Sequence, residues 1–338
     1  MVTPRTPPAA PPAVEVLAHR RAEARAARDW LAADSLRAEI EAAGWKVIDQ
    51  GLRFRLEPIH PPDVLEARRV RYGSSGAVPS CLDEPPTALA SVVVLADRWP
   101  DDLARALDGL RAHASAGTQV VVVANDPTPE QADQLEDPTG PVTGSIAGAL
   151  PEQVWTSAPI GHAAALNAGI RRAVGGSVIL LDSSVEPTGD FVTPLLEALE
   201  DPSVAVAGGW GLRSGDLRHF EAAGAGDVDV IEGAVLAFRR SDYARRGPLD
   251  ERFRFYRHLD IWWSLMLRDA GDGGPHRRAL QLDLPAIRHP QRGDTSLPEP
   301  ERDRLSRRNF YRIIDRFGGR RDLLIAPDAR LPGSHPAG

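Results

Sequence analysis

The sequence predicts an α/β fold in which a mostly parallel sheet is flanked by helices. Three observations predict it. From Leu89 onward, short apolar runs alternate with amphipathic segments. The runs are apolar throughout, which is typical of strands that are covered on both faces. The connections between them are short, as expected when each helix returns the chain to a parallel neighbouring strand.

The first 57 residues predict a small module that precedes this domain. Residues 1–13 are rich in Pro and Ala and are expected to form a disordered tail. Two helices are predicted, one from Val14 to about Trp30 and one from Ala32 or Asp34 to Ala43, closed by Gly44. Alternating residues on either side of Asp49-Gln50-Gly51 then predict a β-hairpin. The module is therefore assigned to residues 14–57, and residues 58–87 to a linker with one short helix near 64–70.

The main domain is assigned to residues 88–325, with a second disordered tail at 326–338. Strands are predicted at 89–95, 119–124, 153–155, 177–181, 204–207 and 230–238, and helices at 99–114, 260–270 and 301–317. The last helix carries Arg307, Arg308 and Arg312, which form either a solvated face or a surface for an anionic acceptor.

Composition limits the classes of function. The formal charge of −7 does not favour a broad nucleic-acid surface. Cys81 is the only cysteine, so no internal disulfide forms, and no apolar run approaches the ~20 residues of a membrane helix. We expect a cytoplasmic protein, or one that lies at the membrane periphery, with no transmembrane segment.

The stretch from Gly161 to Asp190 is the most informative part of the chain. It predicts a helix, a break at Gly175-Gly176 and a buried strand that ends at Asp182. Open parallel sheets bind ligands at the carboxyl ends of their strands, so Asp182 is placed where a metal or a sugar nucleotide would lie. The alternative is an Asp that caps the next turn.

The main domain resembles a family 2 glycosyltransferase of the GT-A fold over about residues 85–295. The resemblance rests on the strand 89–95, on the Gly-x-x-x-Ala-x-Asn-x-Gly pattern from Gly161 to Gly169, on Asp182-Ser183-Ser184 at the family's Asp-x-Asp element, and on Gly233 followed by an apolar strand. It implies that a sugar moves with inversion from a nucleotide-sugar donor to an acceptor hydroxyl. The acceptor would be a glycan, a lipid-linked sugar or a protein.

The resemblance also implies roles for individual residues. Asp260 would be the catalytic base, because a hydroxyl is a poor nucleophile until a carboxylate takes its proton. Asp182 and His289 would hold a divalent metal, Mn²⁺ or Mg²⁺. The residues expected on the donor side are Asp97, Asn125, Asp126, Gly161, Asn167, Asp182 and Ser184, and those expected on the acceptor side are Gly233 and Trp263.

The chain departs from the family pattern at several of these positions. Ser184 replaces the second Asp of Asp-x-Asp, which removes one strong metal ligand that Glu186 or His289 would have to replace. Ala124 stands where the family has an Asp that meets the nucleotide base. His289, Asp260 and Trp263 each have a structural alternative, namely a packing histidine, a helix N-cap and a core aromatic.

Residues 20–56 resemble the C-terminal end of bacterial cysteinyl-tRNA synthetases, through Arg21, Asp29-Trp30, Asp34, Ile40 and Gly44, among others. This resemblance suggests a second hypothesis: a catalytically inactive transferase fold that recruits a partner, RNA for example, through its N-terminal module. The acids missing at positions 124 and 184 favour that alternative. A nucleotidyltransferase is disfavoured, because no Gly-rich loop with a basic residue follows the first strand.

Overall fold

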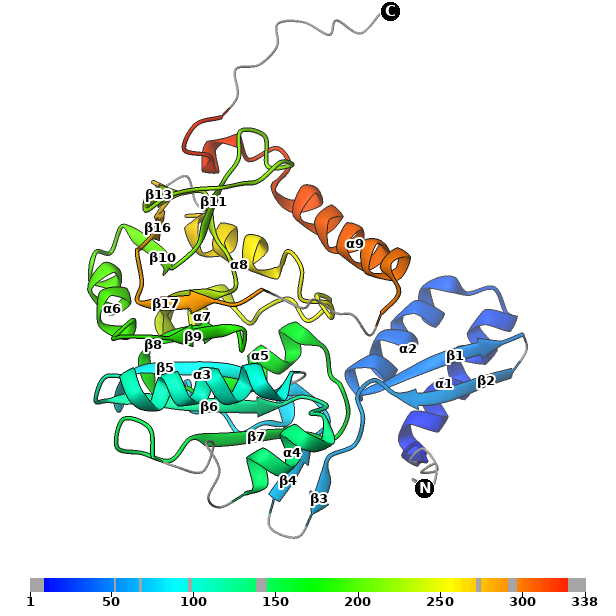
Figure 1. Ribbon diagram of the computed structural model, residues 1–338. Coiled ribbons are helices and arrows are strands. Elements are labelled where there is room, and N and C mark those ends of the chain that lie inside the picture. Colours follow the sequence, from blue (N-terminus) through cyan, green and yellow to red (C-terminus); the bar gives the residue numbers. More distant parts are fainter. Residues whose placement is uncertain are drawn as a thin grey trace, which may run out of the picture.

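The computed structural model describes residues 9–51, 53–66, 69–96, 99–137, 145–271, 275–290 and 297–327. Its N-terminal module lies beside the larger domain (Figure 1). The module consists of α1 (Pro12–Ala26), α2 (Trp30–Ala42), β1 (Trp45–Gln50) and β2 (Arg53–Pro58). The predicted helical hairpin and β-hairpin are confirmed, although α1 begins and ends before the predicted bounds.

The module has a small core of its own. Val14 and Ala18 of α1 pack with Ile40 of α2 and with Trp45 of β1. Arg21 adds a polar tie, since its two terminal nitrogens donate to the Asp49 carboxylate at 2.8 and 3.0 Å. Two residues of the N-terminal motif therefore have a structural role, joining α1 to the hairpin.

The larger domain is built on a ten-stranded mixed sheet in the order β13-β16-β10-β15-β8-β5-β6-β7-β4-β3. Its strands are β3 (Val64–Glu66), β4 (Arg69–Tyr72), β5 (Ala88–Ala96), β6 (Thr118–Ala124), β7 (Glu152–Thr156), β8 (Gly175–Leu181), β10 (Val204–Gly208), β13 (Gly226–Val228), β15 (Val235–Arg239) and β16 (Arg278–Gln281). The central strands β8, β5, β6, β7 and β4 run parallel. The predicted fold class is confirmed.

Smaller sheets and helices complete the domain. The remaining strands are β9 (Val185–Pro187), β11 (Gly211–Arg213), β12 (Glu221–Ala222), β14 (Val230–Ile231) and β17 (Ala286–Arg288). The helices are α3 (Pro100–His113), α4 (Pro129–Glu136), α5 (His162–Arg171), α6 (Val192–Glu200), α7 (Arg240–Arg246), α8 (Leu259–Arg268) and α9 (Glu299–Phe317), with short 3₁₀ turns η1 (Ser75–Ala77) and η2 (Arg321–Leu323).

Two expectations for strands and helices were wrong. Residues 64–66 and 69–72 form β3 and β4 instead of a helix, and β4 pairs with β7, so the sheet extends into the segment expected to be a linker. The strand predicted over 230–238 is interrupted after Ile231 and resumes at Val235. The strand is interrupted because its two parts pair with different partners: β14 pairs with β11, whereas β15 pairs with β8 and β10.

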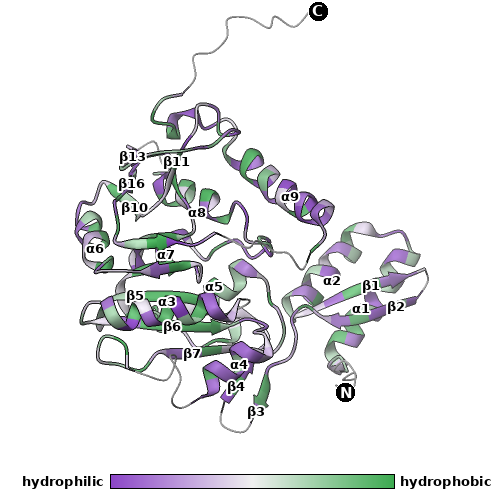
Figure 2. Cartoon of the chain, viewed as in Figure 1, coloured by the Kyte–Doolittle hydropathy of each residue, from purple (hydrophilic) through white to green (hydrophobic). Residues whose placement is uncertain are grey.

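Alternate residues of the central strands face two separate cores. On β5, Val93 and Leu95 pack against α5 and its neighbours, whereas Val92 and Val94 pack against α3 and α6. The hydropathy colouring shows the central strands as apolar and the outer face of α9 as polar (Figure 2). The continuous apolar character of these strands thus follows from burial on both sides.

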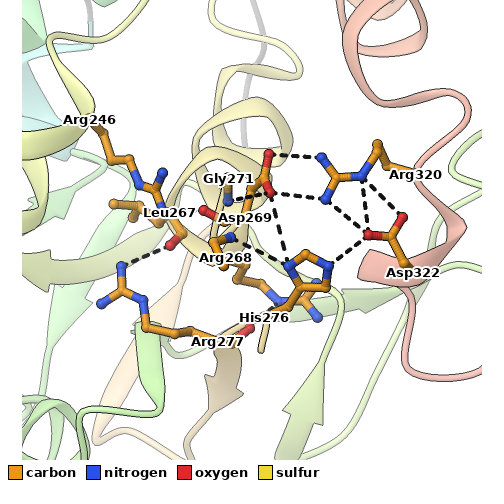
Figure 3. A network of polar contacts seen from close by, with 10 residues as sticks. Arg246, Leu267, Arg268, Asp269, Gly271, His276, Arg277, Arg320 and Asp322 are labelled. Carbon is orange, nitrogen blue, oxygen red and sulfur yellow. Dashed lines mark hydrogen bonds and ion pairs between the residues drawn. The ribbon is translucent and has the colours of Figure 1, made fainter. Parts of the chain in front are cut away.

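A polar network fixes the chain after α9 to the end of α8 (Figure 3). Arg320 donates two 3.0 Å hydrogen bonds to Asp269, which follows α8, and it also binds Asp322. His276 lies 2.7 Å from Asp322, and hydrogen bonds from Arg320 help to lower the pKa of Asp322 to about 2. These contacts hold α9 across the same side of the sheet as α8.

Candidate active site

A cavity of about 570 Å³ opens at the carboxyl ends of β5 and β8, a size that suits a small-molecule ligand. Its wall combines residues from the end of β8, the break between β14 and β15, the start of α8, β17 and α9. Four of the predicted residues line it together: Asp182, Gly233, Asp260 and Trp263. Asp182 and Asp260 are 78 positions apart in the sequence, and the fold places both on one cavity.

Asp182 is partly buried directly after β8. Its backbone N–H donates to the carbonyl of Ala234 at 3.0 Å, and its Oδ1 accepts the backbone N–H of Ser184 at 2.9 Å. The Ser184 hydroxyl donates to the same oxygen. Ser184 is itself buried and does not line the cavity, so it orients Asp182.

Asp260 lies in the first turn of α8, where His258 is the N-cap residue. Its Oδ2 accepts the backbone N–H of Gly233, and its Oδ1 accepts the N–H of Ile261, each at 2.9 Å. Burial raises the pKa of this carboxyl group, and these two N–H donors oppose the rise while the Glu232 carboxylate adds to it. A carboxylate with a raised pKa is a stronger base than an ordinary Asp.

The cavity wall opposite β8 is formed by α9 and the segment before α8. The Asn309 side chain donates to the carbonyls of Phe255 and Arg257, each at 2.9 Å, and so holds α9 to that segment. His258 Nε2 lies 2.9 Å from the Ser306 hydroxyl. Burial lowers the pKa of His258 to about 4, with the Arg257 charge adding to the effect, so His258 is neutral near pH 7.

Trp263 lies almost entirely in the core, with 1% of its surface exposed. It contacts Phe238 and Tyr243 edge-on, at ring-centroid distances of 5.5 and 5.9 Å. Its indole nitrogen has no hydrogen-bond partner in the part of the chain that the structure describes. Trp263 is therefore mainly a core aromatic residue, and it also borders the cavity.

Two residues expected on the donor side, Asn167 and Asn125, have contacts inside the protein. Asn167 is 1% exposed, donates to Leu249 and Glu251, and accepts from Tyr243 and the Leu249 N–H, with distances of 2.9 to 3.0 Å. These four bonds use the full capacity of a side-chain amide. The buried Asn125 accepts the Ile160 N–H at 3.1 Å.

Gly161 and Asp126 also lie off the cavity wall, and Asp97 lies outside the described residues. Gly161 has a φ of +100°, and a Cβ there would lie 3.2 Å from Arg254. Asp126 is exposed after β6, with a φ of +56°. The Gly-x-x-x-Ala-x-Asn-x-Gly pattern thus has a packing role: a Cβ at Gly169 would lie 2.5 Å from Val93.

His289 lies next to the cavity rather than on its wall. It follows β17, which pairs with β9, and its backbone N–H donates to Ser184 at 3.0 Å. Its Nε2 lies 2.7 Å from the Glu186 carboxylate. Within the described ranges, no group of three or more His, Cys, Asp or Glu residues is placed to hold a metal ion. The donor set of Asp182 and neutral Ser184 therefore does not fit a preformed divalent-cation site.

Several cavity residues were not singled out from the sequence. Glu232 lies in the break between β14 and β15, and Arg288 ends β17, with 2.8 Å between Arg288 Nη1 and Glu232 Oε2. His258, Ser306 and Phe310 come from α8 and α9. No local signal marks them, because they meet only through contacts that are distant in sequence.

Comparisons with known proteins agree with the fold. Residues 91–257 match the family model described as glycosyl transferase family 2. A mannosyltransferase from Pyrobaculum calidifontis, solved with GDP-Man and Mn²⁺, is similar with a TM-score of 0.50 and 19% identity, over 73% of this chain and 71% of that chain. GalNAc-T7, solved with UDP, GalNAc and Mn²⁺, is similar with a TM-score of 0.53 and 12% identity, over 69% and 50%.

No curated protein matches the chain significantly by sequence. In the ranges described above, no helix is long and apolar enough to cross a membrane. The family match and the fold agree: residues 91–257 form a glycosyltransferase family 2 domain with the GT-A fold, and the protein is a glycosyltransferase.

Proposed function

We propose that this enzyme transfers a sugar from a nucleotide-sugar donor to an acceptor hydroxyl with inversion. One observation carries the proposal: a single cavity at the carboxyl ends of the central strands is lined by both Asp182 and Asp260. Both structural relatives were solved with a nucleotide or nucleotide sugar, which supports the class of donor. The acceptor class stays open among glycans, lipid-linked sugars and proteins.

In the proposed reaction, Asp260 takes the proton of the acceptor hydroxyl. The acceptor oxygen forms a bond to the anomeric carbon while the bond from that carbon to the donor phosphate oxygen breaks. The nucleoside diphosphate leaves with the bonding electrons. The N–H groups of Gly233 and Ile261 hold the Asp260 carboxylate in place, and its raised pKa improves its basicity.

Asp182 is assigned to the donor side of the cavity. Its fixed position after β8 and its bonds from Ser184 leave Oδ2 as the oxygen without a described protein partner. That oxygen suits a hydroxyl of the donor sugar or ribose. Both relatives were solved with Mn²⁺, whereas this chain has Ser184 where an Asp-x-Asp element would have its second acid.

The test is thermal unfolding of the full chain with UDP, GDP and dTDP, each with and without Mn²⁺. A ligand at 100 times its dissociation constant stabilises the folded state by about 2.7 kcal/mol. We expect one nucleotide to raise the transition temperature, and Asp182→Ala to reduce the shift. Glu197→Ala, on the exposed face of α6, is the control.

The absence of any shift would contradict donor binding and favour the alternative, an inactive transferase fold that recruits a partner through its N-terminal module. The separate core of that module and its Arg21–Asp49 contact support a self-contained docking unit. Its partner, RNA or protein, is then found by binding assays with the full chain.

A further inference from the structure

Four arginines line the cavity that holds Asp182 and Asp260. They are Arg218, Arg257, Arg288 and Arg307. They come from the β11–β12 connection, the segment before α8, β17 and α9, so the fold gathers them from four separate parts of the chain. The acids on the same wall are Asp182, Glu232 and Asp260. Cationic groups therefore outnumber carboxylates in the cavity.

The carboxylates that remain are poorly arranged to attract a divalent cation. Ser184 replaces an acid, and both its N–H and its hydroxyl donate to Asp182 Oδ1, which uses up lone pairs of the one carboxylate at this turn. A free cation would also be repelled by the guanidinium groups on the same wall. The leaving diphosphate still needs its charge neutralised, and the arginines are the groups present to do so.

Of the four arginines, Arg288 is the best placed to contact a ligand that lies between Asp182 and Asp260. It ends β17 and pairs with Val185 of β9, three residues after Asp182. Its Nη1 lies 2.8 Å from Glu232, the residue before Gly233, whose N–H binds Asp260. The Arg288 guanidinium also lies 5.7 Å from the centre of the Trp210 ring. These contacts hold the guanidinium between the segments that carry Asp182 and Asp260.

We propose that these arginines, and Arg288 above all, bind the diphosphate of the donor and so take the role that a divalent cation would otherwise have. Donor binding then does not require metal. The inference rests on the proposed function, since it assumes a nucleoside-diphosphate donor. A planar guanidinium presents parallel N–H donors that match two phosphate oxygens. Fixed positive charge at the leaving group also stabilises the negative charge that develops there as the glycosidic bond to phosphate breaks.

The experiment is calorimetric titration of the full chain with UDP, GDP and dTDP, in metal-stripped buffer with EDTA and in buffer with Mn²⁺. For the nucleotide that binds, we expect the two dissociation constants to differ by less than about threefold. Arg288→Met should weaken binding about tenfold or more in EDTA, because a charge-assisted contact is lost. Arg288→Lys should recover part of that loss. Arg213→Met, at an exposed position on β11 outside the cavity, is the matched control.

The outcomes separate this inference from the proposed function. Binding that disappears in EDTA and returns with Mn²⁺ overturns the inference and leaves the transferase proposal intact. Equal weakening by Arg288→Met and Arg213→Met also overturns it. A chain that binds no nucleotide in either buffer overturns the proposed function and this inference together. The EDTA comparison uses the unaltered protein, so it decides the question even if a variant does not fold.

Discussion

The backbone N–H of Gly233 donates a 2.9 Å hydrogen bond to Oδ2 of Asp260, which joins the break between β14 and β15 to the first turn of α8. This bond depends on the interruption of the strand, because a residue within a regular strand would donate its N–H to a neighbouring strand. The irregular backbone at residues 232–234 therefore has a defined role at the cavity, namely to hold Asp260.

Asp260→Asn should lower kcat by about 10²-fold or more, because the variant retains the shape of the side chain but cannot accept the acceptor proton. Since the pKa of Asp260 is raised, the rate of the unaltered enzyme should fall as the pH decreases through that raised value. Initial rates across pH, compared with Glu197→Gln, check this. An unchanged kcat would exclude Asp260 as the base.

The titration of Asp260 should also make the stability of the folded protein depend on pH. A raised pKa in the folded state means that protonated Asp260 favours folding, and that this contribution is lost as the pH rises through the folded-state pKa. The difference in transition temperature between Asp260→Asn and the unaltered protein should therefore increase with pH. A difference that does not vary with pH would contradict the raised pKa.

Asn167→Ala should lower the free energy of unfolding by roughly 2–4 kcal/mol, because it leaves several buried groups without partners. Tyr243→Phe removes only one of the four bonds to Asn167 and should cost about 1 kcal/mol. Denaturant titration measures both. Nucleotide affinity, measured under conditions where the variants are folded, should stay unchanged. A selective loss of affinity would show that Asn167 contributes to donor binding.

His258 should remain neutral down to about pH 4, the value to which burial lowers its pKa. Its folded-state pKa lies below the ordinary value of about 6.5, so the stability that neutral His258 supplies is lost as the pH falls from that range toward 4. NMR titration of the imidazole checks the pKa. Titration of His258 near pH 6.5 would show that the contact with α9 is open in solution.

Gly169→Ala should destabilise the domain by about 1–3 kcal/mol through overpacking, because the added Cβ would lie 2.5 Å from Val93 and 2.8 Å from Val123. Gly176→Ala is the matched control, since the nearest atom to its Cβ would lie at 3.6 Å, an ordinary contact. Thermal unfolding of the two variants gives the comparison. Equal stability would show that α5 can move away from the sheet.

The sequence by itself determined the elements that have a continuous apolar run or a clear helical period. The strands at 88–96, 118–124 and 175–181 and the helices at 100–113 and 259–268 lie close to their predicted bounds, because period and apolar character are local properties. The position of Asp182 at the end of a central strand was predictable for the same reason. The family pattern added Gly233 and Asp260 to the candidate site, and both line the cavity with Asp182.

Only the tertiary structure decided which residues share the cavity and which serve packing. Asn167 and Gly169 lie within α5 and are buried, because Gly169 packs against Val93 of β5 and the Asn167 amide binds Leu249 and Tyr243. Arg288, Glu232 and Ser306 reach the cavity through β17, an interrupted strand and α9, which no local pattern connects to Asp182. Pairing between distant segments depends on packing and on hydrogen bonds that are satisfied only in the folded chain, so a single sequence carries no local record of it.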